Sequence, residues 1–315
     1  MGVNFQCHTI SNINEYVDLI KKLRVNDKGS IKELWFRGQA NANWRLIPNA
    51  LRKLVPVSSD FGFKKDLNSD IRNGDTMAGV RVEKMLSEFK RRAIPYLNYT
   101  PKNGFEWMFI AQHYQLPTRL LDWSLNPLIA LHFALPVEVL NKEYGKDVEE
   151  SIEYFMKNGF CKNDGAAIFI IDPCEINTET SGVSEPIDIA NESEKWKCYI
   201  DPVEHGGEAF FPICVNGNSI DKRIVAQSGN FTLHGGCTYP LDYYVVLIPK
   251  IHKIFIPYAF ASQIKSELKM LGITESFVFP DLEGLAKEIA GNEEEWFAQV
   301  KVTGEIYDYL GIEDN

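Results

Sequence analysis

The chain has 315 residues, enough for one large domain or two smaller ones. Hydrophobic residues make up 45% of it and charged residues 24%, which excludes a chain that is disordered as a whole. Lys and Arg number 33 against 43 Asp and Glu, so the net charge of −10 excludes a broad basic face for nucleic acid. A local basic groove is still compatible with this charge.

The sequence also predicts the compartment. The first ten residues, MGVNFQCHTI, contain neither a basic segment nor a long apolar one, so we expect no secretory signal. The longest apolar runs, such as Ala166 to Ile171, are far shorter than the ~18 residues of a membrane-spanning helix. Six cysteines without a CxxC pair argue against a zinc site and against a disulfide scaffold. We therefore expect a cytoplasmic protein without a metal and without a membrane contact.

The first half of the chain predicts mostly helices. Apolar residues recur at helical spacing over residues 13–23 and again over residues 82–89. Between them, Leu34 to Phe36 is dense in residues that suit a buried strand, and we expect Arg37 at the end of that strand. Residues 105–114 are apolar on nearly every side of a helical projection, which indicates a deeply buried helix.

A punctuated stretch from Pro117 to Pro127 predicts a loop that leads into another helix. Asn126 suits the N-cap of that helix because its side-chain oxygen can accept from the first turn. Pro127 suits the first helical position, where a missing N–H donor costs nothing. We therefore expect a helix to begin where this loop ends, and we expect the loop to be part of a functional site.

The second half of the chain predicts mostly strands. Ala166 to Ile171 is a continuous apolar run, which is typical of the central strand of a sheet. Two helices are expected near the C-terminus, over residues 262–271 and 282–289. Shorter strands are expected at residues 209–213, 231–234, 243–248 and 253–256.

Helices mainly in the N-terminal half, packed on a mostly antiparallel β core, indicate an α+β fold and argue against a Rossmann sheet. We expect an N-terminal helical extension over residues 1–30, a main domain over residues 31–290 and a C-terminal tail over residues 291–315. Polar and charged composition predicts surface insertions in the main domain near residues 56–80, 141–164 and 174–206.

Common catalytic motifs are missing from the sequence. It has no GxxxxGK[ST] loop, no GxGxxG after a strand, no GxSxG elbow and no HExxH helix. Nucleotide hydrolysis on a P-loop, Rossmann cofactor binding, α/β-hydrolase chemistry and zincin proteolysis therefore lose their usual signatures. The six histidines never fall at a metal-ligand spacing, so we expect them to have structural roles.

Three segments of the chain resemble the FRG domain family, whose name is the tripeptide Phe36-Arg37-Gly38. The first segment reads LWFRGQ from Leu34 to Gln39 and is followed by WRLIP from Trp44 to Pro48. The second reads AQHYQLPTRLLDW from Ala111 to Trp123, and Asn126-Pro127 follows it. The third comprises Arg223 with AQSGNF from Ala226 to Phe231, and FPDLEGLA from Phe279 to Ala286 also fits.

A second and weaker resemblance is to ADP-ribosyltransferases. These enzymes carry an aromatic-Arg-Gly run at the end of an early strand, a strand with a Ser-rich turn before a helix, and a later turn with a catalytic Glu. Phe36-Arg37-Gly38 is similar to the first run and Asp122-Trp123-Ser124 to the second. The turn from Gln227 to Phe231 occupies the place of the third, with Gln227 where the family has Glu. The resemblance implies an ADP-ribosyltransferase-like fold.

The same resemblance implies NAD as a substrate and Arg37, Ser124 and Gln227 as catalytic residues. Arg37 would hold the phosphates, because a guanidinium matches phosphate oxygens in two places. Ser124 would orient the nicotinamide ribose or the phosphates, and Gln227 would bond a ribose hydroxyl. An amide carries no negative charge, so the charge that stabilises an oxocarbenium-like state would come from Asp122, Glu204 or Glu208. The implied contacts to NAD are made by Arg37, Gly38, Gln39, Arg119, Asp122, Trp123 and Ser124.

Structural roles for the same residues stay open at this point. Arg119 and Asp122 can pair with each other or cap backbone groups, since structural ion pairs mimic functional ones. Trp123 stands next to aliphatic residues and can belong to the core. Gln112 and its neighbours His113 and Tyr114 lie on one predicted helix, where a polar trio more often supports a site by hydrogen bonds than performs catalysis.

Three functions are compatible with these patterns. The first is an enzyme that transfers ADP-ribose to a macromolecular acceptor or hydrolyses NAD, an activity that suits bacterial toxins and phage-defence effectors. The second is a non-catalytic FRG module that senses a nucleotide or a nucleic acid. The third is an interaction domain in which the motifs only build the core. The sequence leaves open the acceptor, which can be a protein or a nucleic acid, and also the oligomeric state and the trigger.

Overall fold

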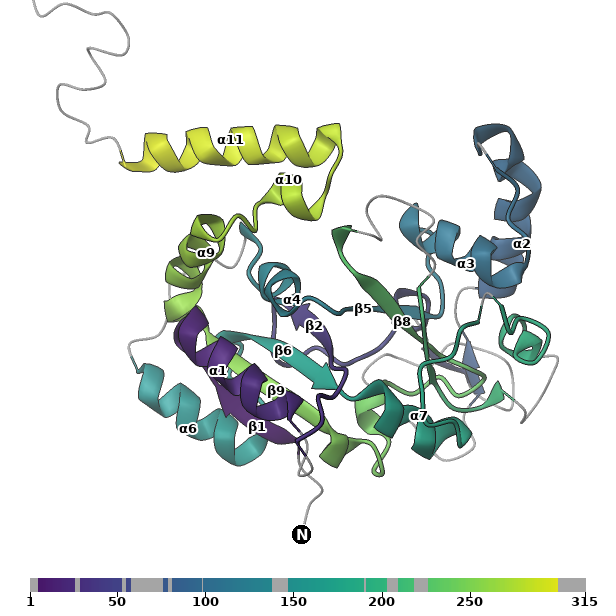
Figure 1. The fold of residues 1–315 in the computed structure, drawn as a ribbon, viewed down its shortest axis with the longest axis horizontal. Coiled ribbons are helices and arrows are strands. Elements are labelled where there is room, and N and C mark those ends of the chain that lie inside the picture. Colours follow the sequence, from purple (N-terminus) through teal and green to yellow (C-terminus); the bar gives the residue numbers. More distant parts are fainter. Residues whose placement is uncertain are drawn as a thin grey trace, which may run out of the picture.

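The computed structural model describes residues 5–25, 29–52, 55–57, 76–78, 81–97, 99–137, 147–189, 191–202, 209–217 and 226–299. Within these ranges the chain forms a seven-stranded mixed sheet covered by helices on both faces (Figure 1). The predicted α+β class and the mostly antiparallel sheet are confirmed.

The strand order of this sheet is β1-β9-β6-β2-β5-β8-β7. β1 and β9 pair in parallel, and the other neighbours pair antiparallel. A separate two-stranded sheet joins β3 (Val55–Val57) to β4 (Thr76–Ala78). The strands of the main sheet are β1 (Gln6–Thr9), β2 (Trp35–Gln39), β5 (Leu120–Ser124), β6 (Gly165–Ile171), β7 (Ile213–Val215), β8 (Gly229–Leu233) and β9 (Ile251–Pro257).

The described helices are spread along the whole chain, whereas the sequence predicted them mainly in the N-terminal half. Those of the first half are α1 (Ile13–Arg24), α2 (Val82–Ala93), α3 (Gly104–His113), α4 (Pro127–Ala134) and α6 (Val148–Asn158). Those of the second half are α7 (Pro173–Ser181), α9 (Ala261–Met270), α10 (Glu275–Val278) and α11 (Leu282–Gln299).

β6 lies inside the sheet, as its apolar run predicts, and every one of its residues is buried. Ala166, Ile168 and Ile170 face a core that includes residues of α1, α4 and α9. The alternate residues, from Ala167 to Ile171, face a second core that includes residues of α6 and α7. A strand that is covered on both faces has no polar position, and this explains its continuous apolar sequence.

α3 covers the other half of the sheet, over β5, β8 and β7. Phe109 of α3 stacks on Phe231 of β8 with ring centroids 5.0 Å apart, inside a third core that also contains Leu120 and Leu233. α4 stands over β2 and α3 over β5, β8 and β7, so the two helices cover neighbouring parts of the sheet (Figure 1).

Three predicted elements are wrong. Residues 209–213, predicted as a strand, share only Ile213 with β7 (Ile213–Val215). Residues 120–124, predicted as part of a loop, form β5. This strand has only five residues and lies between the turn-forming residues Pro117 and Asn126, so its sequence shows no clear strand pattern. Residues 243–248, predicted as a strand, run from the last residue of a 3-10 turn at Leu241–Tyr243 to the first residue of another at Ile248–Lys250. Tyr243, Val245 and Val246 are exposed, so their β-branched and aromatic character does not reflect pairing in a sheet.

The predicted extension and insertions contribute to the fold in different ways. Residues 1–30 supply β1, which pairs with β9 at the edge of the sheet, as well as the helix that was expected there. Residues 141–164 supply α6, whose Phe155 stacks on Phe255 of β9. Residues 58–75, 203–208 and 300–315 lie outside the described part of the chain, and so do Glu204, Glu208 and Arg223. No described helix is both long and apolar enough to cross a bilayer.

Gly38 allows α4 to lie directly on β2. A Cβ atom at Gly38 would stand 1.8 Å from the carbonyl oxygen of Ala130 and 2.6 Å from the backbone nitrogen of Ala134. Both of these atoms belong to the helix backbone, which cannot move aside as a flexible side chain can. The glycine of the FRG tripeptide is therefore required by helix packing.

We expect Gly38→Ala to lower the free energy of unfolding by about 1–3 kcal/mol or more, because the added methyl group forces α4 away from the sheet. Urea denaturation monitored by circular dichroism measures this loss. Gly291→Ala is the matched control: Gly291 lies in α11 with no atom within 4 Å of the built Cβ, so this change should be neutral or stabilise by up to ~1 kcal/mol. Equal stability of the two variants would contradict the packing argument.

Lys253 of β9 is a buried lysine that is 3% exposed. Its Nζ donates to the carbonyl oxygen of Gly159 at 2.8 Å and lies within 6 Å of four aromatic rings, those of Phe5, Phe155, Phe160 and Phe169. Burial lowers the pKa of Lys253 to about 8, although Asp242 opposes the shift. The rings and the carbonyl favour the ammonium form but do not replace its water.

We expect the unfolding free energy to rise with pH between about 8 and 10.5 by up to ~1.4 kcal/mol per pH unit from this group. In that range the unfolded chain still holds the Lys253 proton and the folded chain has lost it, so a rise in pH favours the folded state. Urea denaturation at several pH values, compared between the natural chain and Lys253→Met, isolates the contribution. A Lys253→Met chain with the same slope would contradict it.

Candidate functional site

The sheet opens between β2 and β5. β2 pairs with β6 along its whole length, and β5 pairs with β8 along its whole length. β2 and β5 share only one paired position, Phe36 opposite Ser124. Beyond this position the two strands part, and residues 37–39 of β2 no longer pair with residues 121–123 of β5.

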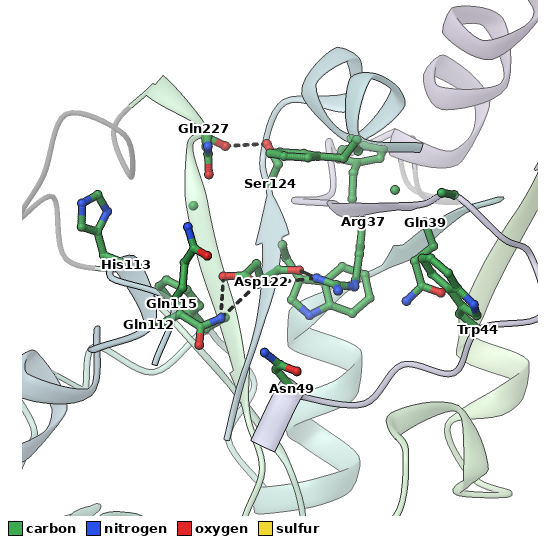
Figure 2. Close-up of a pocket in the computed structure, with 18 of the residues that line it drawn as sticks. Arg37, Gln39, Trp44, Asn49, Gln112, His113, Gln115, Asp122, Ser124 and Gln227 are labelled. Atoms are coloured by element: carbon green, nitrogen blue, oxygen red, sulfur yellow. Dashed lines mark hydrogen bonds and ion pairs between the residues drawn. The ribbon is translucent and has the colours of Figure 1, made fainter. Parts of the chain in front are cut away.

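A cavity of about 570 Å³ lies at this opening, between α3 and α4. Phe36 and Asp122 belong to its strand wall, while Phe109 and Phe133 line it from α3 and α4. Its volume is within the range of pockets that bind small molecules, roughly 300–1,000 Å³. Figure 2 shows the polar groups around it: Gln112, Gln115 and His113 on one side of Asp122, and Gln39 and Trp44 on the other side of Arg37.

Arg37 lies in the opening itself. Its Nη1 donates to the backbone carbonyl oxygen of Asp122 at 2.7 Å and stands 3.8 Å from a carboxylate oxygen of the same residue. The side chain is 15% exposed, and its buried Nε has no hydrogen-bond partner. Burial lowers the pKa of Arg37 to about 10, Asp122 opposes this shift, and the nearby guanidinium of Arg52 adds to it. Arg37 is therefore still a cation at neutral pH. The sequence placed Arg37 at the end of β2, whereas it is the third of the five residues of that strand.

Asp122 is the acidic side chain of the cavity, and no other described lining residue is acidic. Its carboxylate is 57% exposed and accepts hydrogen bonds from the amide nitrogen of Gln112, at 3.1 Å from each oxygen. The sequence left open an ion pair between Asp122 and Arg119, and the structure does not form this pair. A cation and an anion therefore stand side by side in one cavity.

Ser124 and Gln227 are neighbours on adjacent strand ends. The hydroxyl of Ser124 donates to the backbone carbonyl oxygen of Gln227 at 2.7 Å and accepts from the backbone N–H of Asn126 at 3.0 Å. The side-chain amide of Gln227 donates to the carbonyl oxygen of Val278 at 3.2 Å. Both residues line the cavity, but the hydroxyl of Ser124 already serves to hold the turn together.

Gly38 and Gln39 also line the cavity. Gln39 is 4% exposed, and its Oε1 has no partner, while its amide nitrogen stands 3.4 Å from the carbonyl oxygen of Arg45. A buried acceptor without a donor is costly unless a ligand or a water supplies one. Gln39 therefore has an unsatisfied buried acceptor beside the cavity.

The remaining predicted site residues are part of the scaffold. Trp123 lines the cavity but is only 2% exposed, belongs to the second core, and donates from Nε1 to the hydroxyl of Thr232 at 3.1 Å. Arg119 does not line the cavity. Its guanidinium donates to the carbonyl oxygens of Tyr199, Ile200 and His234, each at 2.9 Å, and its Nε lies 3.4 Å from Glu83.

The residues that approach the cavity from the segment after β2 were not among the predicted site residues. Trp44, Asn49 and Arg52 line it, and Trp44 is 54% exposed, which is unusual for a tryptophan. Trp44 lies within the stretch after LWFRGQ that resembles the FRG family, but a tryptophan in a sequence gives no sign of whether it is exposed. Arg52 comes just before the predicted insertion and carried no motif.

No group of three His, Cys, Asp or Glu side chains in the described ranges is arranged to hold a metal. The charged groups of the cavity, Arg37, Arg52 and Asp122, fit an organic ligand that carries both anionic groups and hydroxyls better than a metal ion.

The comparison with known families gives one result: residues 32–142 match the FRG domain. All the described lining residues of the cavity lie in this range except Gln227, Gly229 and Phe231. A search of curated proteins and a search of solved structures found no match. The resemblance to ADP-ribosyltransferases therefore stays a prediction from the sequence.

We expect Arg119→Met to destabilise the protein by about 3–5 kcal/mol, because it leaves three carbonyl groups and Glu83 without their buried partner. Arg37→Met should cost only about 1–2 kcal/mol, since it removes one hydrogen bond and also the burial of a cation. Urea denaturation of both variants makes the comparison. A larger loss at Arg37 than at Arg119 would show that Arg37 is the structural arginine.

Proposed function

We propose that the cavity binds NAD and that the protein cleaves the bond between nicotinamide and ribose. The observation that supports this most directly is the pairing of Arg37 and Asp122 at the opening of the sheet, in a cavity of about 570 Å³. A guanidinium suits a phosphate group, and a carboxylate suits a ribose that develops positive charge. The proposal agrees with the order of sequence runs that resemble ADP-ribosyltransferases.

The phosphates of NAD would lie at Arg37 and Arg52. The two guanidiniums are close enough for Arg52 to lower the pKa of Arg37, and both line the cavity. Two cations beside each other suit two phosphates, as in a diphosphate, better than one.

The two ends of the dinucleotide would reach the two sides of the cavity. The exposed ring of Trp44 offers a stacking surface for a base on one side. Gln112, Gln115 and His113 lie on the opposite side (Figure 2), and Gln115 adopts a left-handed backbone conformation at φ 62°. Amide side chains donate and accept hydrogen bonds, which is what a carboxamide or a base edge requires.

The reaction would break the C1′–N bond, with its electron pair leaving on the nicotinamide ring and positive charge developing on the ribose. The carboxylate of Asp122 would stabilise that charge, which Gln227 cannot do because an amide is neutral. A water or a nucleophilic group of a macromolecule then adds at C1′ and releases a proton. The acceptor decides whether the protein is a hydrolase or a transferase, and either activity suits a toxin or a phage-defence effector in the cytoplasm.

A second candidate is a module that binds the nucleotide without turnover. The amide of Gln227 donates to Val278 and the hydroxyl of Ser124 donates to Gln227, so these two implied catalytic side chains already hold the scaffold together. In that case Arg37, Asp122 and Gln39 would recognise the ligand, and binding would be the whole function.

We expect the purified protein to release free nicotinamide from NAD, with or without cell lysate as a source of acceptors, and chromatography measures this release. Asp122→Asn should lower the rate by about 10²–10³-fold, because the variant keeps the shape of the site but loses the negative charge. Its affinity for NAD, measured by calorimetry, should change far less than its rate.

The control for this experiment is Asp18→Asn, which removes an exposed carboxylate from α1, outside the cavity. Its rate should equal that of the natural chain. NAD binding without nicotinamide release in any condition would favour the non-catalytic module, and no binding at all would refute both candidates.

A further inference from the structure

A chain of hydrogen bonds holds the carboxylate of Asp122 from the side opposite Arg37. The side-chain nitrogen of Gln112 donates to both carboxylate oxygens at 3.1 Å (Figure 2). The oxygen of the same amide accepts from the hydroxyl of Thr118 at 2.7 Å. Thr118 is 2% exposed, and its hydroxyl in turn stands 3.1 Å from the backbone N–H of Leu120.

The direction of this chain is fixed at Asp122, because a carboxylate can only accept hydrogen bonds and Gln112 must therefore turn its amide nitrogen toward it. A backbone N–H can only donate, so Leu120 takes up a lone pair of the Thr118 hydroxyl. The hydrogen of that hydroxyl points at the oxygen of Gln112, the end of the amide that faces away from Asp122. The amide nitrogen of Gln112 is left facing Asp122, and it has only N–H groups to offer.

The opposite orientation of the Gln112 amide is unfavourable. It would place the amide oxygen about 3 Å from two carboxylate oxygens, where all of these atoms are acceptors, and it would leave the Thr118 hydroxyl hydrogen without its partner. The network thus selects one orientation of the amide, although its two ends have nearly the same shape.

Asp122 needs such a support because its side chain is 57% exposed. A carboxylate in water has several rotamers, and an exposed ion pair at 3.8 Å is too weak to select one of them. A carboxylate offers about four lone-pair positions. Gln112 occupies the lone-pair positions on one side of the carboxylate, so the remaining lone-pair positions face the cavity.

We propose that Gln112 is a positioning residue for Asp122, that Thr118 holds the oxygen end of its amide in place, and that the open lone pairs of Asp122 accept hydrogen bonds from the ribose hydroxyls of the ligand. This inference rests on the proposed function for the identity of the ligand. The orientation of Gln112 itself does not depend on NAD, because every atom of the network belongs to the protein.

The test compares Thr118→Val, which removes the hydroxyl at nearly constant volume, with Thr118→Ser, which keeps it. Two probes are titrated by calorimetry: ADP-ribose, which carries ribose hydroxyls, and inorganic pyrophosphate, which carries none. Thr118→Val should weaken ADP-ribose about tenfold, the effect of one hydrogen bond to a charged group, and leave pyrophosphate within about twofold. Thr118→Ser should bind both probes as the natural chain does.

A merely structural role of Thr118 would weaken both probes equally, and this outcome would overturn the inference. Unchanged binding of both probes to Thr118→Val would overturn it as well. Thermal melting checks that each variant is folded, since Thr118→Val also leaves the Leu120 N–H without its acceptor.

A second measurement separates this inference from the proposed function. The side-chain amide resonance of Gln112, assigned by its loss in Gln112→Leu, should exchange its protons with water about tenfold faster in Thr118→Val than in the natural chain or in Thr118→Ser. If the natural chain binds neither probe, the proposed function fails, and the amide exchange alone then decides whether the network holds Gln112. Equal exchange in all three chains would overturn the positioning role.

Discussion

The contact between Arg37 and Asp122 joins β2 to β5 just beyond the position where the backbone pairing of these two strands stops. β2 and β5 share one paired position, and just past it the guanidinium of Arg37 donates to the carbonyl oxygen of Asp122 in place of a strand-to-strand hydrogen bond. A buried cation is costly unless the surrounding groups compensate for its lost water. The carboxylate of the same aspartate supplies part of this compensation, so the opening between the strands holds both a positive and a negative charge.

The helices on either side turn this opening into a cavity. α4 lies directly against β2 because Gly38 has no side chain, and α3 is anchored to β8 by the stacking of Phe109 on Phe231. The distance between these helices follows from their packing on different strands of one sheet. The FRG match over residues 32–142 includes β2, β5 and both helices, which means that it covers nearly all of the cavity wall. The rest of the chain completes the sheet with β1, β6, β7, β8 and β9.

Much of this could be predicted from the sequence, and the remainder depends on contacts between distant residues. The continuous apolar run of β6 and the capping pattern at Asn126 and Pro127 each contain enough local sequence information to identify the element. β5 does not, since five residues among turn signals have no clear period. Arg37, Asp122, Ser124 and Gln227 were predicted from a resemblance and do line one cavity. Arg119 was predicted for the same reason, yet its three carbonyl partners come from segments about 80 or more residues away, which no local pattern reveals.

The most direct test of the account is whether a nucleotide occupies the cavity between Arg37 and Trp44. Fluorine NMR of the protein labelled with 5-fluorotryptophan and titrated with ADP-ribose answers this, because Trp44 is 54% exposed at the cavity and Trp296 is 45% exposed on α11, outside it. The account predicts that the Trp44 resonance, assigned by its loss in Trp44→Phe, shifts with saturation while that of Trp296 stays constant. A titration that leaves Trp44 unchanged, or shifts both resonances equally, would contradict it.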